Sequence, residues 1–114
     1  MNKKETKNKR ITFPVIDGVI FCDSQNIVRI EALGKYSILY MTDSEDAIKL
    51  LVNIGEIERF LNEFKTLFRC HRSHIVNIQF IEKLITKSNI IVTQKGSVPI
   101  SRRKKNEFLN IIYN

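Results

Sequence analysis

Short segments in which apolar and polar residues alternate recur along most of this chain. Each runs for four to seven residues, and most are bounded by Asp, Asn, Ser or Gly, a pattern typical of strands with one buried face. In chain order the segments lie at residues 11–15, 18–22, 26–31, 36–42, 47–52, 80–85, 89–93 and 97–100. Because only a few turn residues separate neighbours, such as Gly34 and Lys35, consecutive segments are expected to pair as hairpins. The chain is therefore predicted to be mostly β.

Two segments depart from this alternation and predict short helices. In residues 55–64, apolar side chains recur at the i, i+3, i+4 and i+7 spacing of one helical face, and Asn53 precedes them as a candidate N-cap. The positions concerned are Ile57, Phe60, Leu61 and Phe64, and all four are expected in the core. A second helix is expected near the C-terminus, through Phe108, Leu109, Ile111 and Ile112.

Length and composition favour one small domain. A chain of 114 residues with 43% hydrophobic content can bury a single core. Residues 1–10 are polar and rich in lysine, so we expect a basic flexible tail or linker there and the folded domain at residues 11–114. No apolar run is long enough to span a membrane, and the N-terminus does not resemble a signal peptide, which predicts a cytoplasmic protein without membrane contact. Cys22 and Cys70 are expected to be buried free thiols, and neither a metal site nor a cofactor is predicted.

The charge of the chain is sorted along its length. The net charge is +7, yet residues 11–68 carry five basic against nine acidic side chains, whereas residues 69–114 carry nine basic against two acidic. A field of this shape steers a polyanion toward one face of the molecule. A solvated basic surface kept for solubility is the alternative, but it would not explain why the charge gathers around Ser, Asn and His.

Two clusters of hydrogen-bonding and cationic side chains follow short apolar runs. The first lies at residues 69–77, with the sequence Arg-Cys-His-Arg-Ser-His-Ile-Val-Asn, and the second at residues 99–105, with Pro-Ile-Ser-Arg-Arg-Lys-Lys. Guanidinium, hydroxyl and amide groups bind phosphate oxygens and base edges, so the clusters point toward nucleic acid.

These clusters, together with the Glu-Ala-Leu-Gly-Lys-Tyr run at residues 31–36, closely resemble the LytTR family of bacterial DNA-binding domains. The resemblance covers roughly residues 15–112. It implies an elongated, mostly β fold of several small antiparallel sheets that inserts loops into successive major grooves. Members usually follow a phosphorylatable receiver domain, as response regulators of two-component systems, and regulate transcription from paired promoter repeats. The chain has no room for a receiver, so it is either a standalone regulator or a piece of a longer one.

The resemblance and the side-chain chemistry select the same three loops for DNA contact, around residues 35–37, 71–73 and 101–104. Arg72 and Arg103 are the candidates for base contacts, Ser37 or Lys35 supplies the third insertion, and His71 suits either a base or the backbone. Asn77 is a candidate too, although an amide that holds the loop together is favoured, and His74 is expected to be structural. The complete predicted DNA-binding set is Lys35, Tyr36, Ser37, His71, Arg72, Ser73, Asn77, Ser101, Arg102, Arg103 and Lys104. Lys35, Arg69, Lys104 and Lys105 are expected to neutralise phosphates.

The same residues leave three other functions open. Catalysis is disfavoured, because no carboxylate lies near His71, Ser73 and His74 to orient a base. An RNA-binding module is the closer rival, since Tyr36 and Phe80 could stack unpaired bases. A module that binds an acidic protein through the same basic patch is the third possibility. The expected partners are double-stranded DNA at promoter repeats and, as a further candidate, RNA polymerase, with a chain that is monomeric in solution and pairs on DNA.

Overall fold

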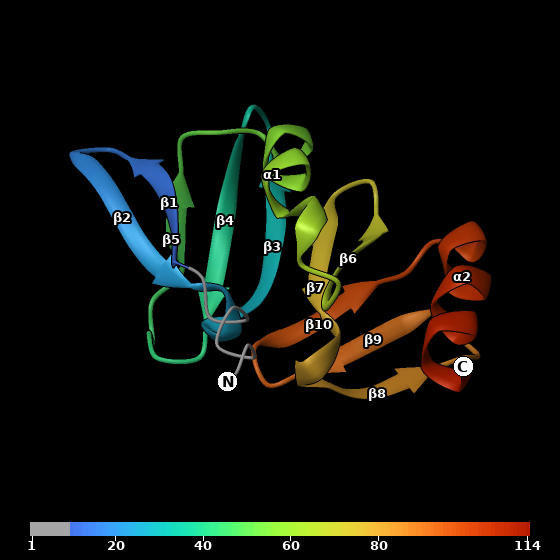
Figure 1. Cartoon of the computed structure of the whole chain (residues 1–114). Coiled ribbons are helices and arrows are strands. Elements are labelled where there is room, and N and C mark those ends of the chain that lie inside the picture. Colours follow the sequence, from blue (N-terminus) through green and yellow to red (C-terminus); the bar gives the residue numbers. More distant parts are fainter. Residues whose placement is uncertain (1–9) are drawn as a thin grey trace, which may run out of the picture.

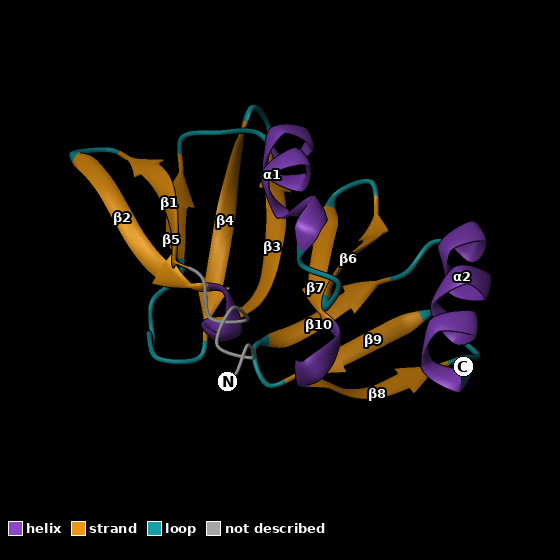
Figure 2. Cartoon of the chain, viewed as in Figure 1, coloured by secondary structure: helices purple, strands orange, loops and turns teal. Residues whose placement is uncertain are grey.

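The computed structural model describes residues 10–114, which form three antiparallel sheets and two α-helices (Figures 1 and 2). The strands are β1 (Arg10–Val15), β2 (Gly18–Asp23), β3 (Ile27–Leu33), β4 (Tyr36–Met41), β5 (Ile48–Leu50), β6 (Leu67–His71), β7 (His74–Asn77), β8 (Ile81–Ile85), β9 (Ile90–Thr93) and β10 (Gly96–Pro99). The α-helices are α1 (Ile54–Phe60) and α2 (Arg102–Tyr113). Short 3-10 turns lie at η2 (Ser24–Asn26), η3 (Leu61–Glu63) and η4 (Ile78–Phe80). The predicted fold class of several small antiparallel sheets is confirmed.

The largest sheet has five strands in the order β5-β4-β3-β7-β6. β3 pairs with β4 through Ala32 and Ser37, and with β7 through Glu31 and His74. Since both partners run antiparallel to β3, the β3–β4 turn and the β6–β7 turn lie at the same end of the sheet. Figure 1 shows both turns along the upper edge of the molecule.

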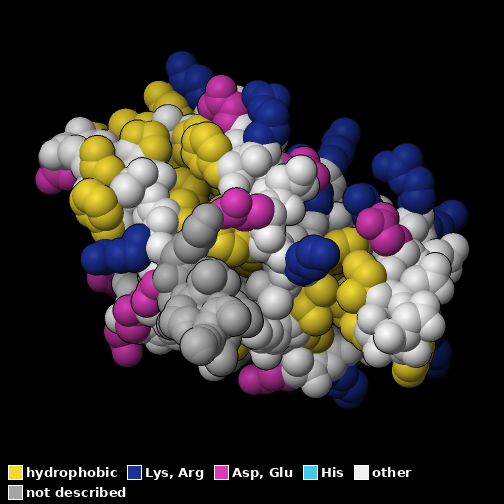
Figure 3. All heavy atoms as spheres, in the orientation of Figure 1, with side chains coloured by type: hydrophobic (Ala, Val, Ile, Leu, Met, Phe, Trp, Pro, Cys, Tyr) yellow, Lys and Arg dark blue, Asp and Glu magenta, His cyan; other side chains and the backbone are white. Residues whose placement is uncertain are grey.

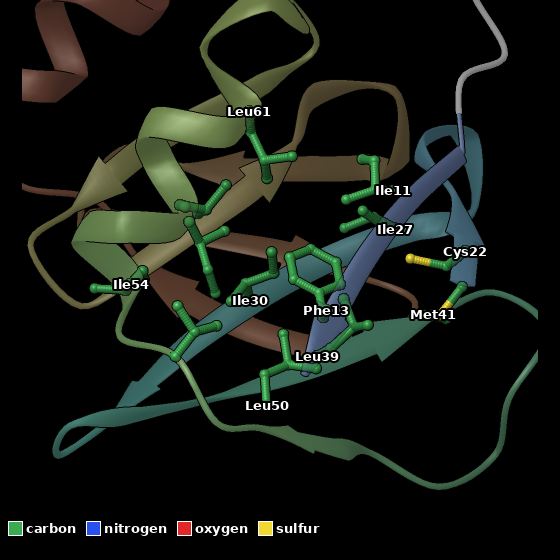
Figure 4. Packing of buried hydrophobic residues seen from close by; sticks show 13 residues of the cluster. Ile11, Phe13, Cys22, Ile27, Ile30, Leu39, Met41, Leu50, Ile54 and Leu61 are labelled. Carbon is green, nitrogen blue, oxygen red and sulfur yellow. The ribbon is translucent and has the colours of Figure 1, made fainter. Parts of the chain in front are cut away.

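One hydrophobic core lies between this sheet, the β1–β2 hairpin and α1. Phe13 of β1 is fully buried at its centre and packs among residues of the large sheet such as Ile30, Leu39 and Leu50 (Figure 4). The helix α1 begins because the side chain of Asn53 accepts a hydrogen bond of 2.9 Å from the Glu56 N–H, as predicted for its N-cap. The resulting helix contributes Ile54 and Ile57 to this core.

A second core lies on the other face of the β6–β7 hairpin. Alternation along β7 sends Ile75 into the first core and Val76 into the second, where Phe68 and Cys70 of β6 also lie. The three-stranded sheet β10-β9-β8 and α2 complete this core, and Phe108 of α2 packs its ring 5.8 Å from that of Phe68. The β6–β7 hairpin is thus held between two cores, which makes it a rigid support for its turn.

A buried arginine joins the large sheet to the three-stranded sheet. Arg29 of β3 donates from Nε to the Lys95 carbonyl at 2.7 Å and from Nη1 to Glu31 Oε1 at 3.1 Å, while its guanidinium lies 3.7 Å from the centre of the Tyr40 ring. Gly96 belongs to the same joint, because a Cβ there would lie only 3.1 Å from Arg29 Nη2. Arg29 thus links the two sheets through its hydrogen bond to Lys95, while its ion pair with Glu31 holds the guanidinium in place.

The structure corrects three details of the sequence prediction. Arg10 begins β1 and is not part of a tail, while residues 1–9, where the rest of the flexible tail was predicted, lie outside the described residues. Phe60 is 52% exposed, because the chain tightens into η3 immediately after it and the helical spacing no longer holds. Residues 102–104, predicted as a loop, form the first turn of α2. No helix in the described part of the chain is long and apolar enough to cross a membrane.

Candidate nucleic-acid interface

The three segments predicted to contact DNA converge on one edge of the molecule. The Ala32 N–H donates to the Ser73 carbonyl at 2.8 Å, which joins the β3–β4 end of the sheet to the β6–β7 turn. The Ser101 N–H donates to the Cys70 carbonyl at 3.0 Å, which joins the start of α2 to the end of β6. Figure 1 shows the two turns and the start of α2 along the same side of the fold.

The β3–β4 turn presents one free cation. Gly34 has a φ of 60°, the left-handed conformation that a tight hairpin turn needs at this position, and Lys35 at the tip is exposed. Tyr36 is half-buried, with Lys35 Nζ 5.5 Å and Lys49 Nζ 4.7 Å from its ring centre. Ser37 does not reach the surface: it is fully buried, and its Oγ donates to the Val52 carbonyl at 2.8 Å. The structure therefore leaves Lys35, and not Ser37, as the side chain of this turn that can meet a ligand.

The β6–β7 turn exposes Arg72 while its backbone is held. Ser73 is half-buried, and its N–H donates to Nδ1 of His71 at 3.0 Å, so Nε2 is the ring nitrogen of His71 that this bond leaves available. His71 also packs edge-on against His74, with ring centres 5.5 Å apart. The guanidinium of Arg72 forms no ion pair or hydrogen bond with any other described residue, so it is free to bind a ligand.

Two further polar side chains of this hairpin, those of Asn77 and His74, lie wholly or partly inside the fold. Asn77 is fully buried, and its side chain donates to the Ile27 carbonyl at 2.9 Å and accepts from the Gln79 N–H at 3.0 Å. It holds β7 to the start of β3, as the favoured interpretation of this amide predicted, so its place in the DNA-binding set is not supported. His74 is half-buried, and its Nδ1 is a buried atom without a hydrogen-bond partner. Burial lowers the pKa of His74, against an opposing effect of Glu31.

The first turn of α2 presents two further free cations. The Ser101 side chain accepts from the Lys104 N–H at 3.2 Å and so serves as the N-cap. Arg102 and Arg103 are exposed at the first two helical positions, and neither forms an ion pair with another described residue. Lys104 is half-buried, with Nζ 3.4 Å from Glu107 Oε1 and 5.6 Å from the centre of the Phe68 ring. No acidic side chain lies in this turn, so the positive end of the helix dipole meets positive side chains.

The structure thus sorts the basic residues into free and occupied ones. Lys35, Arg72, Arg102 and Arg103 are exposed and unpaired among the described residues, and all lie on the same edge. Figure 3 shows lysine and arginine side chains spread along this upper rim, over the β3–β4 hairpin, the β6–β7 turn and α2. Arg69 and Lys105, expected to bind phosphate, are instead bound within the fold.

Sequence reasoning missed these internal roles. Lys105 donates from Nζ to the Thr86 carbonyl at 3.1 Å and to Asn89 Oδ1 at 2.8 Å, which fastens α2 to the β8–β9 turn. One residue in the sequence marks the turn to which Lys105 binds. Asn89 tolerates the left-handed conformation that this turn requires, and it adopts that conformation here with a φ of 57°. Arg69 contacts carbonyls that no sequence pattern places beside it.

The RNA-binding alternative loses support from this geometry. Tyr36 lies at the turn end of the large sheet, whereas Phe80 follows β7 at the opposite end, so the two rings do not form one stacking platform.

The thiols are buried as predicted, and burial raises the pKa of Cys22 to about 11 and that of Cys70 to about 12. Neither thiol is therefore a reactive thiolate near pH 7. Within residues 10–114, no three His, Cys, Asp or Glu side chains gather where they could hold a metal ion.

Comparison with known proteins agrees with the resemblance seen in the sequence. Residues 17–112 match the family described as the LytTr DNA-binding domain. Among solved structures, this fold is similar to the LytTr DNA-binding domain of a protein described as a methyl-accepting/DNA response regulator from Bacillus cereus. The two are 23% identical with a TM-score of 0.71, and the match covers 90% of this chain and 95% of that one. Comparison with curated proteins gave no match. Since the family match spans most of the described residues, this chain belongs to the LytTr family of DNA-binding domains.

Proposed function

We propose that this domain binds double-stranded DNA sequence-specifically and regulates bacterial transcription from paired promoter repeats. The observation that supports it is the gathering of four unpaired cations on three tips at one edge, at Lys35, Arg72, Arg102 and Arg103. The molecule measures 42 × 41 × 25 Å, so its two longer dimensions exceed the ~34 Å repeat of the double helix. One domain can therefore reach two successive major grooves.

The four cations divide into two roles in this proposal. Arg72 and Arg103 make bidentate contacts with guanine, for which the planar guanidinium is suited. Lys35 and Arg102 contact phosphates, as do the free N–H groups at the start of α2. A phosphate there also relieves the unfavourable meeting of Arg102 and Arg103 with the helix dipole.

The cellular setting follows from this role. The domain acts in the cytoplasm, RNA polymerase is a candidate partner of the bound complex, and the chain is monomeric until two copies occupy adjacent repeats. Sedimentation at micromolar concentration without DNA checks the last point. Val19 and Phe21 of β2 are more than half exposed, so Phe21→Ser tells whether a dimer, if one forms, uses that strand.

The decisive experiment begins with selection of bound fragments from a random duplex pool. Affinity for the selected site is then compared with that for a scrambled duplex. We expect Arg72→Ala and Arg103→Ala each to weaken the selected site by about 1–3 kcal/mol and to relax preference at one or two positions. Lys83→Ala, which removes one positive charge from an exposed site on β8 in the three-stranded sheet, is the matched control.

Several outcomes would overturn the proposal. Failure to select any sequence would exclude specific recognition. Tighter binding to single-stranded RNA, or to an acidic polypeptide, than to the selected duplex would favour the two rival functions. Equal losses for selected and scrambled duplexes would make Arg72 and Arg103 backbone ligands.

A further inference from the structure

We propose that Arg69 and Glu58 are positioning residues that set the sequence preference of the domain by clamping the β6–β7 turn, without contacting DNA. This inference rests on the proposed function, because it concerns how Arg72 is aimed at a base. Arg69 lies in β6, and Glu58 lies in α1, on a different element of the fold. The clamp consists of the two side chains and the turn carbonyls that they hold.

Arg69 engages all three nitrogens of its guanidinium within the protein. Nε donates to the His71 carbonyl at 3.0 Å, and Nη2 donates to the Arg72 carbonyl at 2.5 Å. Nη1 donates to Glu58 Oε1 at 2.5 Å, with the Arg69 side chain 19% exposed. A guanidinium engaged on three sides has little capacity left for a phosphate, so Arg69 differs from the free Arg72 nearby.

The turn does not adopt the conformations that two-residue hairpins most often use. Two residues, Arg72 and Ser73, connect β6 to β7, and the common two-residue hairpin turns require a positive φ in at least one of them. Neither has one, since Asn89 is the sole non-glycine residue with a positive φ among those described. The pairing register also shifts between Arg69 and His71.

Hydrogen bonds from β6 and β3 hold this turn. The carbonyls of His71 and Arg72 accept from Arg69, the Ser73 carbonyl accepts from the Ala32 N–H, and the Ser73 N–H donates to the His71 ring. The backbone that carries Arg72 is thus fixed on several sides while its side chain stays exposed. Fixing a contact group before binding reduces the entropy lost on binding, and a bidentate base contact depends on this alignment.

Glu58 is the part of the clamp that folding needs least. Its side chain is 47% exposed, and ion pairs at exposed positions contribute little to stability. It nevertheless fixes the guanidinium that holds two turn carbonyls. Loss of Glu58 should therefore alter which DNA is bound far more than whether the domain folds.

The test compares Glu58→Ala with Glu56→Ala. Both residues are exposed on α1, both changes remove one negative charge, and among the described residues the Glu56 carboxylate forms no ion pair. For Glu58→Ala we expect the ratio of affinities for selected and scrambled duplexes to fall about tenfold, comparable to one lost bidentate contact. Glu56→Ala should keep the wild-type ratio, and both variants should bind the scrambled duplex slightly more tightly because repulsion from DNA is reduced.

Arg69→Lys is a second test of the clamp, and it leaves the charge of the chain unchanged. Lysine cannot make the three directed contacts, so the ratio should fall while affinity for the scrambled duplex and its salt dependence stay as in the wild type. Equal ratios for Glu58→Ala and Glu56→Ala would overturn the clamp, as would a Lys variant with the wild-type ratio. If the wild-type chain itself showed no preference among duplexes, the proposed function would fail first, which is a distinguishable result.

Discussion

At the scale of single residues, Asn77 links three parts of the chain through one buried amide. Its two hydrogen bonds reach the Ile27 carbonyl and the Gln79 N–H, and Asn77→Ala would remove the partner of both groups, leaving the Ile27 carbonyl buried without it. We expect the free energy of unfolding to fall by about 2–3 kcal/mol, measured by urea denaturation. Sequence preference of the folded fraction should be unchanged. A stable variant that loses preference would restore Asn77 as a base contact.

His74 makes stability depend on pH in a defined direction. Burial lowers its pKa in the folded protein below the usual value near 6.5, so the unfolded chain takes up a proton that the folded chain resists. Stability from this residue is present above pH ~6.5 and is lost as the pH falls below it. Urea unfolding at pH 7.5 and 5.5 should therefore show a larger loss for the wild type than for His74→Gln. Equal losses would mean that His74 titrates alike in both states.

At the scale of elements, the start of α2 balances helix capping against affinity for phosphate. Ser101→Ala removes the cap of α2 and should cost about 1 kcal/mol of stability. Ser101→Asp keeps a capping oxygen and adds a favourable interaction with the helix dipole of about 0.3–1 kcal/mol, so it should be at least as stable as the wild type. Its carboxylate beside Arg102 should nevertheless weaken binding to all duplexes. Thermal melting and titration with DNA measure the two effects, and wild-type affinity in the Asp variant would place this helix end away from phosphates.

At the scale of the whole molecule, the number of unpaired cations on the DNA-facing edge sets how steeply affinity for DNA falls with salt concentration. Four unpaired cations on one edge predict that log affinity falls linearly with log salt concentration, with a slope of about −3 to −4 from the described part of the chain. Residues 1–9 add four lysines and one glutamate, so deleting them should make the slope shallower for every duplex alike. Affinity titrations from low to moderate salt provide the slope. Loss of sequence preference on deletion would show that this segment reads DNA.

The sequence by itself determined eight of the ten described strands, the helix capped by Asn53, and the two clusters that carry the family resemblance, because alternation, capping and turn residues act within a few positions of one another. Only the tertiary structure decided which members of those clusters are free. Ser37 and Arg69 have the same chemistry as exposed DNA ligands, yet one is bound to Val52 across the sheet and the other to Glu58 of α1. A polar side chain is available to a ligand only if nothing in the fold already satisfies it, and its partners here come from distant parts of the chain. The residues that bind and those that position could therefore be told apart only once β3, β6 and the two helices were brought together.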